Sequence, residues 1–256
     1  MASRFRRSHA FRLSSEPFSL TTEDGIGLVG VRLGRGDPAV VLCHGFMGWH
    51  RKPAVGRLAE GLASTLAVYT FDHRGHGRSG GVCTFGDREI LDVDAAVARA
   101  RADGHRRVVT VGASMGGVAV LRHAGLLGGV DGVVAISAPA RWEGHGTAAF
   151  RRMTWLTSSR RGRRAARILG LRLADRWDSP ESPAEVIGKI APTPVVLVHG
   201  RDDHFFDEEE AWALYRNAGE PRKLLLAGRF GHAEDGFTQT FAARLGREIA
   251  TMGTSG

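Results

Sequence analysis

The sequence predicts an α/β protein with a mostly parallel, twisted sheet of about eight strands and helices on both faces. Three observations predict this class. Short apolar runs without polar alternation, typical of strands buried on both faces, alternate with segments whose apolar residues recur at helical spacing. The composition, 43% hydrophobic and 24% charged, is that of a globular protein with a sizeable core. A glycine-flanked serine stands where one valine-rich run meets a helical segment.

The first part of the chain predicts a basic arm followed by a hairpin. The first 12 residues contain four arginines and no acid, and they lack the apolar stretch of a secretory signal. We therefore expect residues 1–16 to form a flexible arm. Apolar runs at 18–22 and 26–33 flank Glu23-Asp24-Gly25, where an acid followed by glycine is typical of a hairpin turn.

The later elements follow in alternation. The apolar run 39–43 predicts the first strand of the parallel part, and the apolar spacing after Pro53 predicts the first helix. Further strands are expected at 67–71, 107–112, 132–137, 194–200 and 223–227. Helices are expected at 53–64, 88–102, 115–127, 208–218 and 236–250.

One interval interrupts this alternation. No core strand is apparent between Ser137 and Pro194, a length too great for a plain connection in a compact domain. Residues 148–156 and 160–177 are each expected to be helical. We therefore expect one domain over 17–256, with a helical lid inserted at about 140–192.

The charge distribution argues against a nucleic-acid function. The net charge of +8 lies in the N-terminal arm and in residues 141–191, while the rest of the chain is slightly acidic. No nucleic-acid-binding motif is present. The basic lid leaves open an anionic substrate, an anionic lipid surface, or a plain solvated helix face. No apolar run is long enough to span a membrane, and two cysteines without a disulfide pattern favour a cytoplasmic setting.

The segment from Val108 to Leu121, VVTVGASMGGVAVL, contains a G-x-S-x-G pattern centred on Ser114. A valine strand precedes it and an apolar helix follows, which is the context of a nucleophile held on a sharp turn. A glycine-rich turn with a helix-capping serine is the alternative. A nucleophilic serine also needs a base and an acid that orients the base.

Candidates for the other groups follow later strands. Asp202 and Asp203 come directly after the strand ending at Gly200, and His232 follows the last strand. Because sites in open parallel sheets lie beyond the carboxyl ends of the strands, these side chains are expected near Ser114. The backbone N–H groups of Phe46 and Met115 are the expected donors to an oxyanion.

Five segments in this order make the chain resemble the α/β-hydrolase fold superfamily. They are HGF (44–46), FDHRGHGRS (71–79), GASMGG (112–117), HGRDD (199–203) and GHAED (231–235). The resemblance covers about residues 17–250. It implies that Ser114 is the nucleophile, His232 the base, and Phe46 and Met115 the oxyanion-hole donors. In such proteins the acid lies three residues after the glycine that ends the strand, which implies Asp203, with Asp202 as the alternative.

The resemblance implies a serine hydrolase that cleaves a small or medium-sized carboxylic ester through an acyl-enzyme, with no cofactor. Thioesterases, carbon–carbon bond hydrolases, peptidases and perhydrolases of similar build use the same triad, and a non-catalytic binding protein is a further alternative. His73 and His76 are expected to be structural rather than metal ligands, because no acidic or cysteine cluster completes a set. The oligomeric state does not follow from the sequence.

Overall fold

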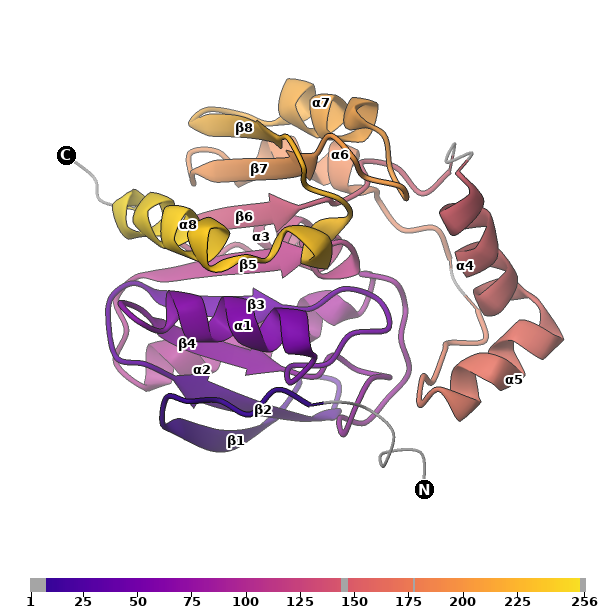
Figure 1. The fold of residues 1–256 in the computed structure, drawn as a ribbon, viewed down its shortest axis with the longest axis horizontal. Helices are drawn as coiled ribbons and strands as arrows, with labels where there is room; N and C mark the ends of the chain where they lie inside the picture. The colour runs from indigo at the N-terminus through magenta and orange to yellow at the C-terminus, as the bar shows by residue number, and fades with distance from the viewer. Residues whose placement is uncertain (1–7, 144–146, 177, 254–256) are drawn as a thin grey trace.

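The computed structural model describes residues 8–143, 147–176 and 178–253. Within these residues one eight-stranded sheet has the order β1-β2-β4-β3-β5-β6-β7-β8 (Figure 1). The strands are β1 (Ser15–Thr21), β2 (Gly27–Leu33), β3 (Ala39–Cys43), β4 (Ala67–Phe71), β5 (Val108–Ala113), β6 (Gly132–Ile136), β7 (Val195–Gly200) and β8 (Arg222–Ala227). The β1–β2 and β2–β4 pairs are antiparallel, and all other neighbours are parallel. The mostly parallel sheet predicted from the sequence is confirmed.

The central strands are buried on both faces. Every residue of β3 and β5 is buried, which explains why their sequences show no polar alternation. Val41 of β3 lies opposite Tyr69 of β4 on one side and Thr110 of β5 on the other. This register places the carboxyl ends of β3 and β5 side by side, so that Cys43 pairs with Gly112.

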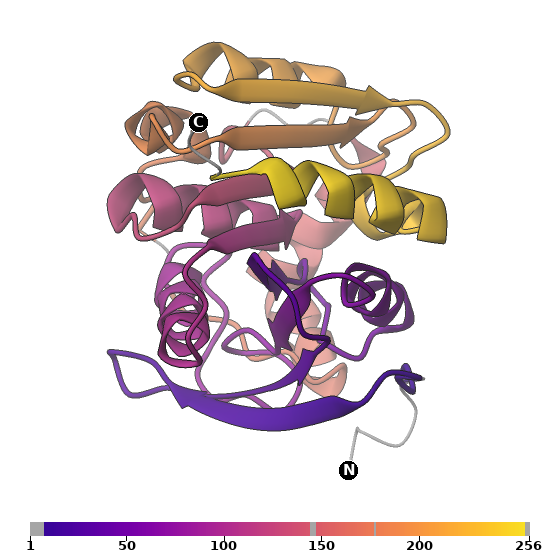
Figure 2. The same ribbon diagram turned by 90° about the vertical axis from the view of Figure 1, so that its left-hand side faces the viewer.

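Helices cover the two faces of the sheet separately (Figures 1 and 2). One core joins the sheet to α1 (Pro53–Leu62) and α8 (Gln239–Thr251). The opposite core joins it to α2, α3 and α7. These three helices span Glu89–Ala102, Met115–Leu126 and Glu208–Asn217. The helical layers leave the carboxyl ends of the parallel strands uncovered at one edge.

The interval after β6 divides into two parts. Helices α4 (Ala148–Ser158) and α5 (Arg160–Ile168) lie beside the carboxyl ends of the strands and apart from both helical layers (Figure 1). We call the segment 147–174 the lid. The helix expected over 160–177 ends at Ile168, because Gly170 takes a positive φ of 79° and Leu171 turns into the core.

The second part of the interval belongs to the core. Helix α6 (Pro183–Val186) and the 3₁₀ turn η2 (Ile187–Ile190) pack against α3, and Val186 and Ile187 are fully buried. The expected insertion at 140–192 is therefore too long at its C-terminal end. The burial of Val186 and Ile187 places the segment 183–190 in the core, although the prolines in and around it suggested part of the insertion.

The N-terminal segment 1–16, predicted to be a flexible arm, is packed against the rest of the protein over the part that the structure describes. Its first seven residues lie outside the described part of the chain. His9 Nε2 lies 3.1 Å from Glu60 of α1, and the ring of Phe11 packs under the guanidinium of Arg51 at 4.8 Å. Strand β1 already begins at Ser15. The segment 9–13 is thus held against α1 and the residues that precede it. No helix among the described residues is both long and apolar enough to cross a membrane.

Candidate active site

Ser114 stands alone between a strand and a helix. Strand β5 ends at Ala113 and α3 begins at Met115. Ser114 has φ 53° and ψ −118°, a left-handed backbone conformation that costs an L-residue about 1–3 kcal/mol. Its N–H donates to the carbonyl oxygen of Ile136 at 2.8 Å. The alternative of an ordinary capping serine does not fit, because the side chain makes no capping hydrogen bond to α3.

The glycines around Ser114 permit close backbone approach. A Cβ on Gly112 would collide with the backbone of Gly116, and a Cβ on Gly116 would lie 2.5 Å from the carbonyl oxygen of Cys43. A Cβ on Gly45 would lie 3.2 Å from the Cβ of Ser114. The loop after β3 therefore lies directly against Ser114, and only glycine fits the tightest of these contacts.

Asp203 and His232 form a hydrogen-bonded pair. The Nδ1 of His232 lies 2.8 Å from Oδ2 and 3.0 Å from Oδ1 of Asp203, whose side chain is 1% exposed. The backbone N–H groups of Phe205 and Phe206 donate to the same carboxylate at 2.8 and 3.1 Å. Asp202 is exposed and, among the described residues, makes no contact of this kind. The geometry thus favours Asp203 over Asp202.

The Asp203 carboxyl is held in its charged form. Burial by itself favours the neutral acid, but the hydrogen bonds from His232 and from two backbone N–H groups outweigh it. These interactions place the pKa of Asp203 below its usual value. The carboxylate therefore accepts a hydrogen bond from the Nδ1–H of His232, which leaves Nε2 as the unprotonated ring nitrogen.

The backbone around His232 is tied down on both sides. The N–H of His232 donates to Asp235 at 3.0 Å, and the N–H of Ala233 donates to the hydroxyl of Ser137 at 3.0 Å. Ser137 is fully buried at the end of β6 with a positive φ of 50°. The ring of His232 also packs against Phe205, with the ring centroids 4.6 Å apart. The role of Ser137 was not predicted from the sequence, because a serine directly after a strand is only a weak indication of a residue that supports a site.

Two cavities meet at Ser114. The larger, of about 910 Å³, is lined by Ser114, His232, several residues of α4, and Leu169, which follows α5. The smaller, of about 500 Å³, is lined by Ser114, Met115 and aromatic side chains that include Phe85 and Trp142. The described hydrogen bonds do not join Ser114 to His232, but both side chains face one cavity. Catalytic hydrogen bonds are often longer before a substrate is bound.

The two expected oxyanion donors lie beside Ser114. Met115 is the first residue of α3, so its N–H has no acceptor within the helix. Phe46 lies in the loop that follows β3, and within the described part of the chain its N–H donates to no other group. Phe46 and Met115 both line the smaller cavity with Ser114.

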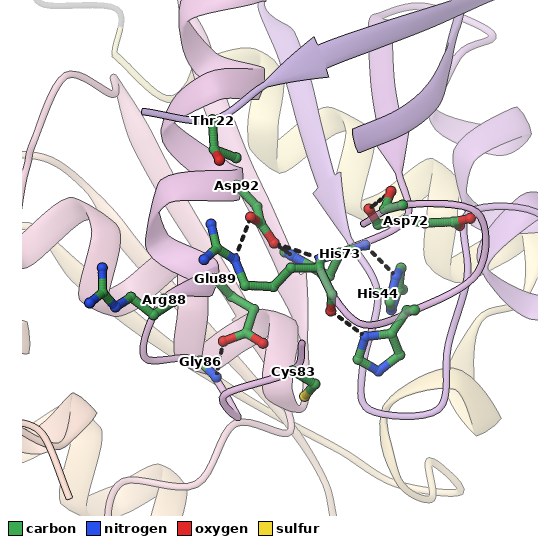
Figure 3. Close-up of polar contacts among 12 residues, drawn as sticks. Thr22, His44, Asp72, His73, Cys83, Gly86, Arg88, Glu89 and Asp92 are labelled. Atoms are coloured by element: carbon green, nitrogen blue, oxygen red, sulfur yellow. Dashed lines mark hydrogen bonds and ion pairs between the residues drawn. The ribbon is translucent and has the colours of Figure 1, made fainter. Parts of the chain in front are cut away.

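A buried histidine holds the Phe46 loop (Figure 3). The N–H of His73 donates to Nε2 of His44 at 3.0 Å, so Nδ1 of His44 carries the proton and donates to the carbonyl of Gly45 at 2.8 Å. Burial, with His73 and His76 nearby, places the pKa of His44 well below its usual value. The neutral ring thus links the Phe46 loop to the loop after β4.

His73 and His76 take part in the same buried network. Nδ1 of His73 lies 3.2 Å from Asp92 of α2, and Figure 3 shows this contact. Burial opposes charge on His73, but Asp92 outweighs it and the pKa rises to about 10. Burial lowers the pKa of His76 to about 4. The described residues contain no cluster of three or more groups suited to a metal.

Glu89 supports the wall of the smaller cavity. Its carboxylate accepts hydrogen bonds from the N–H of Thr84 at 2.8 Å, the hydroxyl of Thr84 at 2.6 Å and the N–H of Gly86 at 2.8 Å. These bonds fix Phe85, which lies between the two with a positive φ of 58°. This role could not be predicted from the sequence, because an acidic residue in the first turn of a helix is common and needs no long-range partner.

Comparisons with known proteins show which proteins this chain and its fold are similar to. The chain is 28% identical to the uncharacterized protein YfhR of Escherichia coli K12 over 229 residues, which is 83% of this chain and 72% of that protein. Its fold is similar to the Pyrococcus furiosus esterase Pf2001, with a TM-score of 0.75, 22% identity and coverage of 96% and 98% of the two chains. It is also similar to the esterase domain of a Rhodothermus marinus protein, with a TM-score of 0.65, 19% identity and coverage of 93% and 96%.

The match to a family extends over most of the sequence. Residues 40–252 match the description "Alpha/beta hydrolase family". That range contains Ser114, Asp203 and His232, and it begins within β3 and ends after α8. The chain therefore belongs to the alpha/beta hydrolase family.

Proposed function

We propose that this protein is a serine hydrolase that cleaves small or medium-sized carboxylic esters through an acyl-enzyme. Membership of the family supports a hydrolase. The observation that carries the finer proposal is that the hydrogen-bonded pair His232–Asp203 and the strained Ser114 open onto one cavity. Nucleophile, base and orienting acid are the parts that ester cleavage by serine requires.

In the proposed first step, His232 takes the proton of the Ser114 hydroxyl while the oxygen attacks the ester carbonyl carbon. The N–H groups of Phe46 and Met115 donate to the oxyanion of the tetrahedral intermediate. The intermediate collapses, His232 gives the proton to the leaving alkoxide, and the alcohol departs. Ser114 then carries the acyl group as an ester.

In the second step, water attacks the acyl-enzyme. His232 accepts a proton from the water, the hydroxide adds to the carbonyl carbon, and the carboxylic acid leaves as Ser114 regains its proton. The Asp203 carboxylate stabilises the imidazolium of His232 in both steps and does not itself take up a proton. The low pKa of Asp203 suits this role.

The cavities favour an ester of modest size. The smaller cavity, of about 500 Å³, has walls formed mainly by apolar side chains such as Phe85, Val118 and Trp142. Such a space fits a short or aromatic acyl group better than a peptide chain. A thioester or a cleavable carbon–carbon bond presents the same carbonyl to Ser114, and these substrates are the second candidates.

The deciding experiment compares wild type with Ser114→Ala on p-nitrophenyl esters of graded acyl length, on matched thioesters and on p-nitroanilides. We expect hydrolysis of the short esters by wild type and a loss of about 10⁶-fold in kcat for Ser114→Ala, as for other serine nucleophiles. A fluorophosphonate probe should label wild type and leave Ser114→Ala unlabelled. Folded wild type that neither turns over nor takes up the probe would be a binding protein instead.

A further inference from the structure

The lid exposes large apolar side chains. Trp155 of α4 is 54% exposed, Ile168 at the end of α5 is 76% exposed, and Leu169 after it is 44% exposed. Ile168 is the most exposed of the large hydrophobic residues that the structure describes. Three such residues on one short insertion form an exposed apolar patch, which in a globular protein marks an interaction site.

The same surface carries a concentrated positive charge. Residues 147–174 contain eight arginines and no aspartate or glutamate, and this charge equals the net charge of +8 of the whole chain. The exposed arginines of the lid helices are Arg151, Arg152, Arg160, Arg161, Arg164 and Arg167. Arg152 and the four exposed arginines of α5 form no ion pair with any residue in the described ranges. We call these six arginines with Trp155, Ile168 and Leu169 the lid patch.

Helical spacing mixes the apolar and basic side chains within the lid patch. Trp155 lies three and four residues after Arg152 and Arg151, so all three share one face of α4. Ile168 lies four and seven residues after Arg164 and Arg161 and shares their face of α5. A surface that only needed solvation would not place its most exposed apolar residues on the faces that carry its charge.

The lid patch continues into the candidate active site. Trp155, Leu156 and Leu169 line the cavity of about 910 Å³ that also contains Ser114 and His232. In Figure 1 the two lid helices stand at the edge of the molecule where the strands end, so no other layer covers their outer side. A molecule held at the lid patch therefore lies at the entrance of the cavity.

We propose that the lid patch docks on an anionic phospholipid surface and that an ester carried by that surface enters the larger cavity. Arginines pair with lipid phosphates while tryptophan, isoleucine and leucine enter the boundary between headgroups and acyl chains. An acidic protein or a nucleic acid would satisfy the charge but would leave the interleaved apolar side chains unused. The docking stands independently of the proposed function, and only the delivery of an ester rests on it.

The test is co-sedimentation with vesicles, using the full chain with Ser114→Ala so that no lipid is consumed. We expect binding to vesicles with about one third phosphatidylglycerol and little binding to pure phosphatidylcholine. Binding should weaken when salt rises from about 0.05 M to about 0.5 M, because surface charges are screened. Equal binding to both vesicle types, or no binding to either, would overturn the proposal.

Matched variants locate the surface. Arg161→Glu with Arg164→Glu reverses two charges of the lid patch, and Arg244→Glu with Arg247→Glu reverses two exposed arginines at the same spacing on α8. We expect the lid pair to lose more than about tenfold in vesicle affinity and the α8 pair to lose about twofold or less. Trp155→Ala should weaken binding, whereas Trp212→Ala, on the exposed part of α7, should not.

Two further measurements, ester hydrolysis and DNA binding, distinguish the lipid proposal from its alternatives. The double variant Arg161→Glu with Arg164→Glu, in a chain that keeps Ser114, should hydrolyse a small soluble ester at nearly the wild-type rate. This activity shows that the variant folds. Duplex DNA serves as a polyanion without an apolar phase. If DNA binds and vesicles do not, with the same loss in the lid pair, the lid patch is a polyanion site and the lipid proposal is wrong. If vesicles bind but no ester is cleaved, docking stands and the proposed function fails.

Discussion

Gly116, in the first turn of α3, lies so close to the end of β3 that a Cβ on it would stand 2.5 Å from the carbonyl oxygen of Cys43. This approach joins the two segments that supply the candidate machinery, the turn with Ser114 and the loop with Phe46. The loop can stay beside Ser114 only while position 116 has no side chain. The contact is therefore a condition for placing the two proposed oxyanion donors, Phe46 and Met115, side by side.

Gly116→Ala should lower the free energy of unfolding by about 2–3 kcal/mol, because the added methyl group must push apart two backbone segments. It should also lower kcat by displacing Phe46 relative to Ser114. Urea unfolding and ester turnover measure the two effects. The control is Gly27→Ala, where a Cβ meets nothing within 4 Å, and its stability change should stay within about 0.5 kcal/mol. Similar effects at both positions would contradict the argument.

Asp203→Asn should reduce kcat about 10³- to 10⁴-fold, because an amide in this place cannot hold His232 in the tautomer with Nδ1 protonated. Turnover of a short p-nitrophenyl ester measures the loss. The neighbouring Asp202→Asn is a matched control, since Asp202 is exposed and no hydrogen bond joins its side chain to described residues. It should keep kcat within about twofold of wild type. The reverse order of effects would make Asp202 the acid.

The sequence predicted the strands well, because runs such as 39–43 and 67–71 are buried on both faces and have no competing pattern. It also predicted that Ser114, Asp203 and His232 lie near one another, because the parallel strands that precede them end at the same edge of the sheet. Both results depend on local pattern and topology. They needed no knowledge of which distant side chains meet.

Other features depend on long-range contacts and could not be predicted. The sequence pattern of 160–177 predicts a helix that continues past Ile168. In the structure the helix ends there, because the chain turns so that Leu171 is buried in the core. Asp24 reads as a turn residue, yet its carboxylate pairs with Arg74, 50 residues away. Glu89 likewise holds a loop that only the tertiary structure brings to it.

His44→Ala should remove the link between the Phe46 loop and the loop after β4. The buried N–H of His73 then loses its acceptor, which costs about 1–3 kcal/mol in the free energy of unfolding. Because His44 acts through Gly45 and touches no substrate, kcat should fall more than KM rises. His44→Gln keeps an acceptor for His73 and should recover part of both losses. Equal kcat in all three proteins would show that the link has no positioning role.

Asp24 should make stability depend on pH in the acid range. Its carboxylate accepts two hydrogen bonds from the buried Arg74, at 2.7 and 3.0 Å, and these lower its pKa to about 2. Because the pKa is lower in the folded than in the unfolded chain, the stabilisation is complete above the usual aspartate pKa of about 4. It is lost as the pH falls through about 2.

Asp24→Asn should therefore lower the free energy of unfolding by about 1–2 kcal/mol at neutral pH, a value reduced for the 28% exposure of the side chain. Urea unfolding at about pH 7, 5 and 3 should show a constant difference from wild type at the first two and a smaller one at the last. Glu16→Gln removes the exposed partner of Arg32 and should change little at any pH. A difference for Asp24→Asn that stays constant down to about pH 2.5 would mean that the charge of Asp24 is not what holds Arg74.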